Sequence, residues 1–211
     1  MGWFKRHIYP DFYNAYAETF SHPNNSLDTT RFVVFDTETT GLQPKTDKIL
    51  SIGCVAITNG AIDVADSFER YLIQNQFNAD TVKIHGILKN GTIVKTTQHD
   101  AIIQFLDYIK NAVLVAHHAA FDVAMINQAL KQMALPKLKN KVIDTGQLYK
   151  KTKYVKNQKY YSLDALCHLF NITMHDRHTA SGDAYLTAIL FLKLSALLKT
   201  KKNRELKLRD F

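Results

Sequence analysis

Two carboxylates, Asp36 and Glu38, directly follow an apolar run in the segment FVVFDTETTGL, residues 32–42. The run from Phe32 to Phe35 is typical of a strand buried on both faces of an α/β sheet. While the strand continues, alternate side chains point to the same face, so both carboxylates lie on one side. Two like charges beside an apolar strand are unfavourable unless a cation lies between them. The spacing therefore indicates a divalent-metal site, although an isolated acidic pair is also typical of a solvated strand end.

Three further residues could belong to such a site. Asp122 opens a predicted helix, where the helix dipole alone would favour a carboxylate. Asp183 lies in the first part of the last predicted helix, five residues after His178, so the two do not share a simple helical face. A loop histidine beside a helical aspartate nevertheless suits a general base next to a metal ligand. Together these residues favour metal-dependent chemistry.

The elements that position these residues alternate between strands and helices. An Asn59-Gly60 turn predicts an antiparallel hairpin between two strands. Helical periodicity is clear at 96–111, and Ser162 is a predicted N-cap. The predicted strands are 32–35, 49–58, 61–73, 112–118 and 141–145, and the predicted helices are 79–87, 96–111, 119–133, 162–170 and 179–198. This order predicts an α/β domain with a mixed β-sheet flanked by helices.

The two ends of the chain differ from the middle in composition. Residues 11–20 carry aromatic side chains at helical spacing, and the segment that follows contains Pro and Asn, so residues 1–30 are expected to form a helical extension and linker. The aromatic stripe is interpreted as a packing surface. The main domain is expected at 31–198, and residues 199–211 form a basic C-terminal tail.

The charge of the chain is unevenly distributed. The formal net charge is +8, but residues 137–159 carry +7 and residues 193–211 carry +5, so the remainder is mildly acidic. Basic segments on such a body suggest a polyanionic partner such as nucleic acid, although they can also serve only solubility. Cys54 and Cys167 lie in apolar contexts and are interpreted as buried thiols. No stretch approaches eighteen uninterrupted apolar residues, so no membrane is expected, and the cytoplasm is the expected location.

Three segments resemble a known enzyme family. FDTETTGL, VAHHAAFDVAMI and HTASGDAYLTA are similar, in order and spacing, to the three motifs of DEDD-type, DnaQ-like 3′→5′ exonucleases in the variant with a motif-three histidine. The proofreading epsilon subunit of bacterial DNA polymerase III belongs to that family. The resemblance covers about residues 31–198, and it implies a ribonuclease H-like fold. KIHGI and VIDT also resemble family segments on either side of motif two.

The resemblance implies a role for each matching residue. Asp36, Glu38, Asp122 and Asp183 take the metal-ligand positions, and His178 takes the position of the general base. The substrate contacts that it implies are Thr39, Leu42, His85, His118 and Phe121. One departure from the family concerns His118, where relatives usually have Asn, and this leaves the nucleotide preference open.

The chemistry of this family explains the carboxylates. Hydrolysis of a phosphodiester adds negative charge at phosphorus, and two Mg²⁺ or Mn²⁺ ions about 4 Å apart can activate water and stabilise the leaving oxygen. Hard cations prefer oxygen ligands, hence Asp and Glu. His178, with an ordinary pKa near ~6.5, can accept a proton from the attacking water.

The resemblance implies a metal-dependent 3′→5′ exonuclease that releases nucleoside monophosphates from single-stranded or frayed DNA 3′ ends, in proofreading or repair. A DNA polymerase subunit would then be a partner in trans. Two alternatives remain open: an exoribonuclease of the same fold, because the motifs do not decide on the 2′-hydroxyl, and a polymerase-associated binding module with a vestigial site. The five histidines His7, His22, His99, His168 and His175, together with His117, are interpreted as surface or packing residues.

Overall fold

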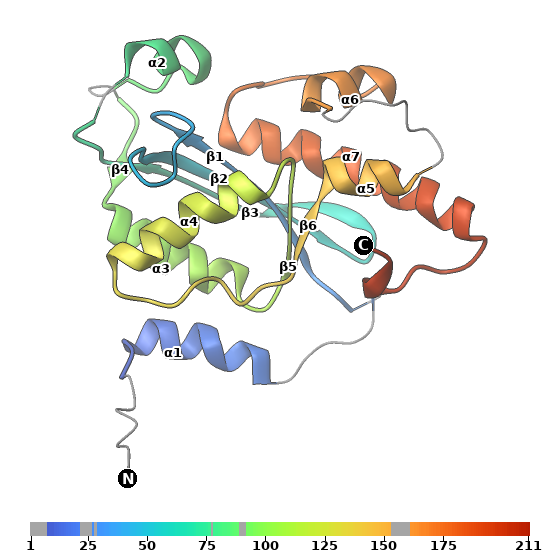
Figure 1. Ribbon diagram of the computed structural model, residues 1–211, viewed down its shortest axis with the longest axis horizontal. Coiled ribbons are helices and arrows are strands. Elements are labelled where there is room, and N and C mark those ends of the chain that lie inside the picture. The colour runs from blue at the N-terminus through green and yellow to red at the C-terminus, as the bar shows by residue number, and fades with distance from the viewer. Residues whose placement is uncertain (1–7, 22–26, 28, 77, 89–91, 153–160) are drawn as a thin grey trace.

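The protein is described by a computed structural model that covers residues 8–21, 27, 29–76, 78–88, 92–152 and 161–211. Its centre is a six-stranded sheet with the strand order β4-β3-β2-β1-β5-β6 (Figure 1). In chain order the elements are α1 (Asp11–Glu18), η1 (Thr19–Ser21), β1 (Phe32–Thr39), β2 (Ile49–Thr58), β3 (Ala61–Leu72), α2 (Ala79–His85), β4 (Lys95–Thr96), α3 (Gln98–Ile109), β5 (Val113–Ala116), α4 (Ala120–Gln132), β6 (Val142–Asp144), α5 (Thr145–Lys151), α6 (Leu163–Leu169), α7 (Ala180–Lys202) and η2 (Leu208–Asp210).

The sheet is mixed, as predicted. β1, β2 and β3 are antiparallel neighbours, and Asn59 and Gly60 between β2 and β3 both have positive φ, at 52° and 74°. That conformation is required by a tight primed hairpin turn. β5 pairs with β1 in parallel, but only along Phe32–Val34, so the end of β1 that carries the acidic residues extends beyond β5. The predicted helices are all present, whereas β4 and α5 were not predicted.

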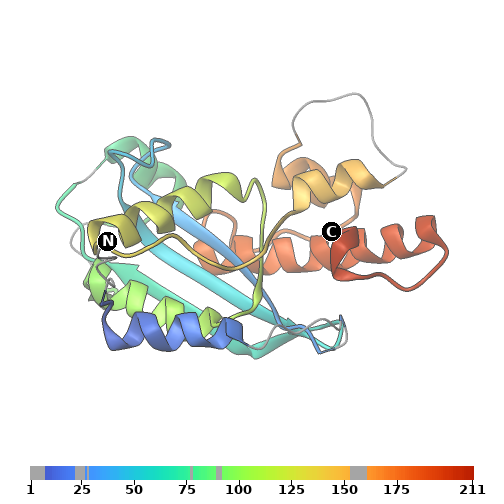
Figure 2. The same cartoon turned by 60° about the horizontal axis from the view of Figure 1, so that its bottom comes forward.

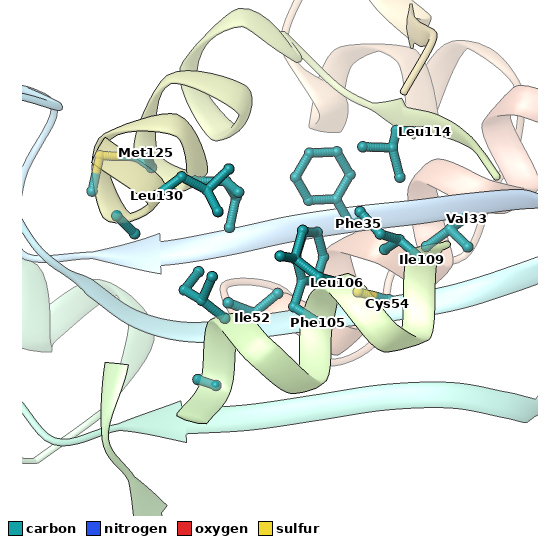
Figure 3. Packing of buried hydrophobic residues seen from close by; sticks show 14 of the residues in the cluster. Val33, Phe35, Ile52, Cys54, Phe105, Leu106, Ile109, Leu114, Met125 and Leu130 are labelled. Atoms are coloured by element: carbon teal, nitrogen blue, oxygen red, sulfur yellow. The ribbon is translucent and has the colours of Figure 1, made fainter. Parts of the chain in front are cut away.

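Helices cover both faces of the sheet (Figures 1 and 2). On one face, Val33 and Phe35 of β1 belong to a hydrophobic cluster shared with α1, α3 and α4 (Figure 3). On the other face, Phe32 and Val34 belong to a second cluster shared with α5, α6 and α7. This alternation has a period of two, as expected for a strand buried on both sides. The side chains of Asp36 and Glu38 continue the series of Phe32 and Val34, and therefore face α7.

The N-terminal helix is part of the core. α1 packs against α3, and its residues Tyr13 and Tyr16 are only 3% and 2% exposed. The hydroxyl of Tyr16 donates to Asn140 Oδ1 at 2.6 Å and accepts from the backbone N–H of Lys139 at 2.8 Å. The interpretation of the aromatic stripe as a packing surface is confirmed, and the helix contributes to the main hydrophobic cluster.

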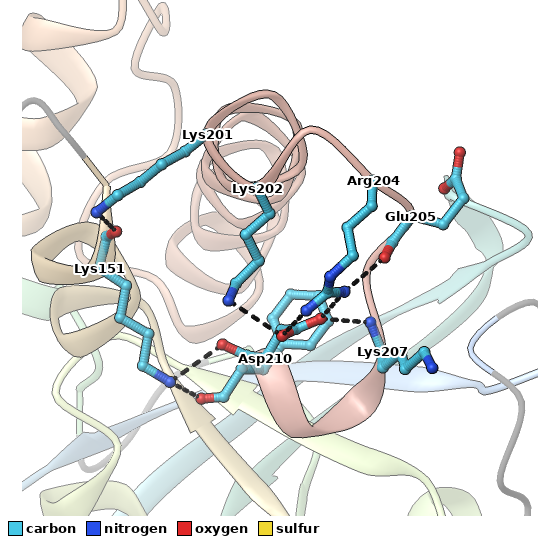
Figure 4. Close-up of polar contacts among 8 residues, drawn as sticks. Lys151, Lys201, Lys202, Arg204, Glu205, Lys207 and Asp210 are labelled. Carbon is cyan, nitrogen blue, oxygen red and sulfur yellow. Dashed lines mark hydrogen bonds and ion pairs between the residues drawn. The ribbon is translucent and has the colours of Figure 1, made fainter.

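The C-terminal residues also fold onto the domain (Figure 4). Residues 199–202 continue α7 beyond the predicted boundary at 198. Asp210 accepts two hydrogen bonds from Arg204, both at 2.8 Å, and Lys151 donates to the backbone carbonyl of Phe211. Much of the charge in this basic segment is therefore engaged within the protein. Residues 153–160 of the other basic segment lie outside the described residues.

One helix has the length and composition of a membrane span. α7 meets that test among the helices that the structure describes, and half of its most apolar window is buried. Its buried residues, among them Leu190 and Phe191, contact β1 and β2 and form the second hydrophobic cluster. The packing of the domain therefore accounts for the apolar character of α7.

Candidate active site

Three of the predicted carboxylates meet at one point. Oxygen atoms of Asp36, Glu38 and Asp183 lie within 4.8 Å of one another. Asp36 and Glu38 come from β1, and Asp183 comes from the first turn of α7. The first turn can approach so closely because β2 has a glycine beneath it: a Cβ on Gly53 would lie 2.2 Å from the backbone carbon of Ala180. The absence of a side chain at Gly53 thus leaves room for the turn that carries Asp183 to lie against the sheet.

The electrostatics of this cluster are those of a cation site. Burial, followed by the charges of Asp122, Asp183 and Glu38, raises the pKa of Asp36 well above its ordinary value. Burial and the charges of Asp183 and Asp122 likewise raise the pKa of Glu38 to about 7. Such shifts show that the ionised carboxylates repel one another and are poorly solvated. A bound cation would relieve both effects.

Asp122, the fourth predicted ligand, approaches from the opposite face of the sheet. It is buried in the first turn of α4, and its Oδ1 accepts from the hydroxyl of Thr37 at 2.6 Å and from the backbone N–H of Thr37 at 3.0 Å. Burial raises the pKa of Asp122 to about 7, while these hydrogen bonds oppose the rise. Asp122 is close enough to affect the pKa of Asp36 and Glu38, but it lies outside the group of three.

Thr37 was not predicted to contribute. It occupies the middle of the acidic pair, and its side chain points to the α4 face while its neighbours point to α7. The period of two along β1 could have revealed this orientation, but the sequence does not show that α4 begins directly opposite. Asp36, Thr37 and Glu38 therefore all contribute side chains to the site.

Arg177 was also missed by the sequence analysis. Its Nη1 donates to Oδ1 of Asp183, and its Nε donates to Oδ1 of Asp164 at 2.6 Å. Asp164 lies in the first turn of α6. The guanidinium lowers the pKa of both Asp36 and Glu38, against the larger opposing effect of burial. A fixed positive charge therefore lies beside the carboxylate cluster.

His178, the predicted general base, lies in the turn that precedes α7. Its side chain is exposed, and its backbone has a φ of 63°, which is unusual for a residue other than glycine. The next residue, Thr179, caps α7 by accepting a hydrogen bond from the backbone N–H of Gly182 at 3.1 Å. His178 therefore comes directly before the helix that carries Asp183, on a solvent-accessible turn.

The predicted substrate-contact residues differ in their surroundings. Leu42 is 83% exposed, whereas His85 is only 7% exposed. The Nδ1 atom of His85 accepts from the backbone N–H of Ile87 at 3.0 Å, so its Nε2 carries the proton, and this atom is buried with no hydrogen-bond partner among the described residues. Thr39 is buried, and its hydroxyl donates to the carbonyl of Gly41 at 2.7 Å. Phe121 is partly buried against the first hydrophobic cluster.

His118 occupies the turn between β5 and α4 together with its neighbour His117. Their Nε2 atoms both lie within hydrogen-bond distance of the carbonyl of Tyr161, at 3.0 and 2.9 Å. His117 Nδ1 also contacts the hydroxyl of Thr145 at 2.8 Å, and burial lowers the pKa of His117 to about 4. His117 is thus a packing residue, as interpreted. His99, His168 and His175 are exposed, and His7 and His22 lie outside the described residues.

The segment VIDT, residues 142–145, contacts the turn between β5 and α4 through Asp144. Oδ2 of Asp144 accepts from the backbone N–H of Ala119 at 2.9 Å, and Oδ1 accepts from the backbone N–H of Gln147 at 2.9 Å. Asp144 therefore caps α5 and ties it to the residue before α4. This contact positions the start of α4, where Asp122 lies.

Comparisons with known proteins place the chain in a family. Residues 33–191 match the family described as exonuclease (RNase_T). DNA polymerase III subunit epsilon of Buchnera aphidicola is 35% identical over 173 residues, which cover 76% of this chain and 69% of that protein. DNA polymerase III PolC-type of Caldanaerobacter subterraneus is 37% identical over 164 residues, 77% of this chain but only 11% of that protein. Escherichia coli exonuclease I, solved with a dT13 oligonucleotide, has the same fold, with a TM-score of 0.70 at 12% identity over 83% of this chain and 43% of that one.

The chain therefore belongs to the exonuclease family, within which its fold and motifs are those of the DnaQ-like 3′→5′ enzymes. The ribonuclease H-like fold that the motifs implied is confirmed. The chain spans about a tenth of the length of the PolC-type relative.

Proposed function

We propose that the protein is a metal-dependent 3′→5′ exonuclease that releases nucleoside monophosphates from DNA 3′ ends. The observation that carries this proposal is the convergence of Asp36, Glu38 and Asp183 within 4.8 Å, with Asp122 close by, in a chain of the exonuclease family. A vestigial binding module would have no reason to retain carboxylates such as Asp36, Glu38 and Asp122, whose pKa values burial and neighbouring negative charge raise, because such groups destabilise the fold.

The chemistry of the site fits Mg²⁺ or Mn²⁺. The candidate ligands are all carboxylate oxygens, which hard divalent cations prefer, and the pKa values of Asp36 and Glu38 stay raised even though Arg177 lowers them, so their negative charge is only partly compensated. Asp36, Glu38 and Asp183 would hold one ion, and Asp122 would help to hold a second. Bound there, the ions would lower the pKa of water and stabilise charge on the phosphodiester oxygens.

The chain's own residues would orient the substrate and accept its proton. His178 is exposed in the turn before α7, and it can take the proton of the attacking water. The N–H of His85 is buried and has no partner among the described residues, and it would donate to a phosphate or sugar oxygen once substrate binding gives access to it. Leu42 is exposed and can pack against the terminal base. Thr39, Phe121 and His118 would complete the nucleotide site.

DNA is the proposed substrate because the relatives over this region are DNA polymerase III proteins. We propose proofreading or repair in the cytoplasm, with a DNA polymerase as a partner. The free cysteines Cys54 and Cys167, both buried, support a reducing compartment. An exoribonuclease of the same fold is the alternative, since nothing in the part of the chain that the structure describes identifies a side chain that would exclude a 2′-hydroxyl.

The test uses labelled oligonucleotides. Purified protein is incubated with DNA or RNA of the same sequence, labelled at the 3′ or the 5′ end, with MgCl₂, MnCl₂ or EDTA. We expect early release of the 3′ label as a mononucleotide, a ladder of shortening 5′-labelled DNA, and no cleavage in EDTA. Faster cleavage of RNA would identify an exoribonuclease, and absence of cleavage with either metal would refute the proposal.

A further inference from the structure

The turn that carries His178 is held by Arg177, which has no assigned role in the reaction. The Arg177 side chain is only 18% exposed, and it reaches two aspartates at once. One is Asp183 in α7, and the other is Asp164 in the first turn of α6. Charge-assisted hydrogen bonds in such a partly buried setting are stronger than those of exposed ion pairs. Arg177 therefore ties the turn to the first turns of two helices.

The backbone of this turn needs such support. Asp176 and His178, on either side of Arg177, both have left-handed φ values, 52° and 63°. This conformation is unfavourable for residues other than glycine, and it persists only where the surroundings enforce it. Thr179 closes the turn by a hydrogen bond from its hydroxyl to the carbonyl of Asp176, at 2.7 Å. Gly182 allows the close approach, because a Cβ there would lie 2.1 Å from the same carbonyl oxygen.

Electrostatic interactions also link Arg177, His178 and Asp164. The hydrogen bond and charge of Arg177, and to a lesser degree His178, lower the pKa of Asp164, against a smaller opposing effect of burial. Asp164 is therefore close to the turn, and it is not part of the carboxylate cluster. It can be changed without removing a predicted metal ligand.

We propose that Arg177 is a positioning residue, whose fork to Asp164 and Asp183 holds the turn in the conformation from which His178 serves the carboxylate cluster. This inference rests on the proposed role of His178 as the general base. It assigns to Arg177 an effect on the rate of cleavage that passes through His178. Because arginine presents a rigid planar fork, lysine cannot make both contacts in the same geometry.

The test is a double-mutant cycle between Asp164 and His178. Asp164→Asn removes the anchoring charge, keeps the size of the side chain and leaves Asp183 in place. We expect it to lower the single-turnover rate on 5′-labelled DNA with saturating MgCl₂ by about tenfold, the effect of a slightly misplaced catalytic group, with KM unchanged within about twofold. In a His178→Ala background, the same change should cause almost no further loss, because residues that act as a unit are non-additive.

Two more variants separate positioning from stability. Arg177→Lys keeps the charge and should reproduce the loss of rate. Arg31→Lys is the control, because Arg31 is also partly buried and also makes two hydrogen bonds to carboxylate oxygens, both of Asp66 at 2.8 Å, outside the site. Arg31→Lys should change the melting temperature about as much as Arg177→Lys does, but should leave the rate of cleavage within about twofold of wild type.

The outcomes separate the two proposals. An active wild-type protein in which Asp164→Asn has no effect, or lowers the rate equally with and without His178, would refute the positioning role alone. A wild-type protein without nuclease activity would refute the proposed function, and this inference with it.

Discussion

The carboxylate cluster should destabilise the protein whenever no cation compensates it, and Glu38 makes this measurable. Its pKa is raised from the ordinary value of 4.5 to about 7, first by burial and then by Asp183 and Asp122. For an acid whose pKa is higher in the folded state, stability is fully present at low pH. It is lost as the pH rises from the unfolded pKa to the folded one. We therefore expect Glu38→Gln to stabilise the metal-free protein at pH 8.

The size of the effect follows from the shift. A rise from 4.5 to about 7 corresponds to about 3 kcal/mol in the free energy of unfolding, at 1.36 kcal/mol per unit. Glu38 is partly exposed, and water screens its charge, so we halve this upper value to about 1.5 kcal/mol. In a protein of 211 residues, such a gain raises the melting temperature by about 3–6 °C.

The assay is thermal unfolding in EDTA at pH 8 and at pH 5. The gain should be present at pH 8 and should shrink at pH 5, where Glu38 in the folded protein carries its proton. Glu18→Gln, at an exposed position at the end of α1, is the control and should change little at either pH. Equal gains at both pH values, or a loss of stability at pH 8, would refute the account of the cluster as mutually repelling carboxylates.

Three other predictions concern single residues. Asp183→Asn should abolish both the activity and the rise in melting temperature that Mg²⁺ causes. His178→Ala should slow cleavage by about 10²–10⁴-fold but keep that rise, which a Mg²⁺ titration followed by thermal shift will measure. A His178→Ala protein that Mg²⁺ fails to stabilise would make His178 a metal ligand. Leu42→Ala should raise KM for DNA with little change in melting temperature, because the side chain is 83% exposed; a marked loss of stability would place Leu42 in the core. Lys150→Gln should reduce the slope of log K against log salt for single-stranded DNA by about 0.7 if the exposed Lys150 binds phosphate, and an unchanged slope would leave it a solubilising residue.

Local patterns predicted most of the fold. The β2–β3 hairpin was predicted because Asn59-Gly60 permits the left-handed turn that it requires. Ser162 was predicted as an N-cap, and its hydroxyl accepts from the backbone N–H of Ala165 at 3.2 Å. β4 was missed because two residues cannot show a period. α5 was missed because it is only seven residues long, is rich in lysine and follows β6 directly. Its N-cap is Asp144, the last residue of β6.

The site was predicted as a set of residues, but not as an arrangement. Family resemblance implied that Asp36, Glu38 and Asp183 belong together, and the structure brings a carboxylate oxygen of each within 4.8 Å of the other two. The sequence gives no measure of distances between elements far apart in the chain, so Thr37 and Arg177 were missed. Thr37 contacts Asp122, and Arg177 contacts Asp164 in α6. Neither threonine nor arginine suggests metal chemistry by its residue type alone.

The end of β1 explains why four acidic residues can converge without belonging to one element. β5 pairs with β1 only as far as Val34, and β1 has α7 on one face and α4 on the other. Asp36 and Glu38 meet Asp183 from α7, while Thr37 turns to the other face and holds Asp122 from α4. The backbone N–H of Thr37 lies beyond the last residue of β1 that pairs with β5, and it donates to Asp122 Oδ1 at 3.0 Å instead. The short pairing with β5 thus leaves this part of β1 open to Asp122 from α4, while Asp36 and Glu38 lie beside Asp183 from α7.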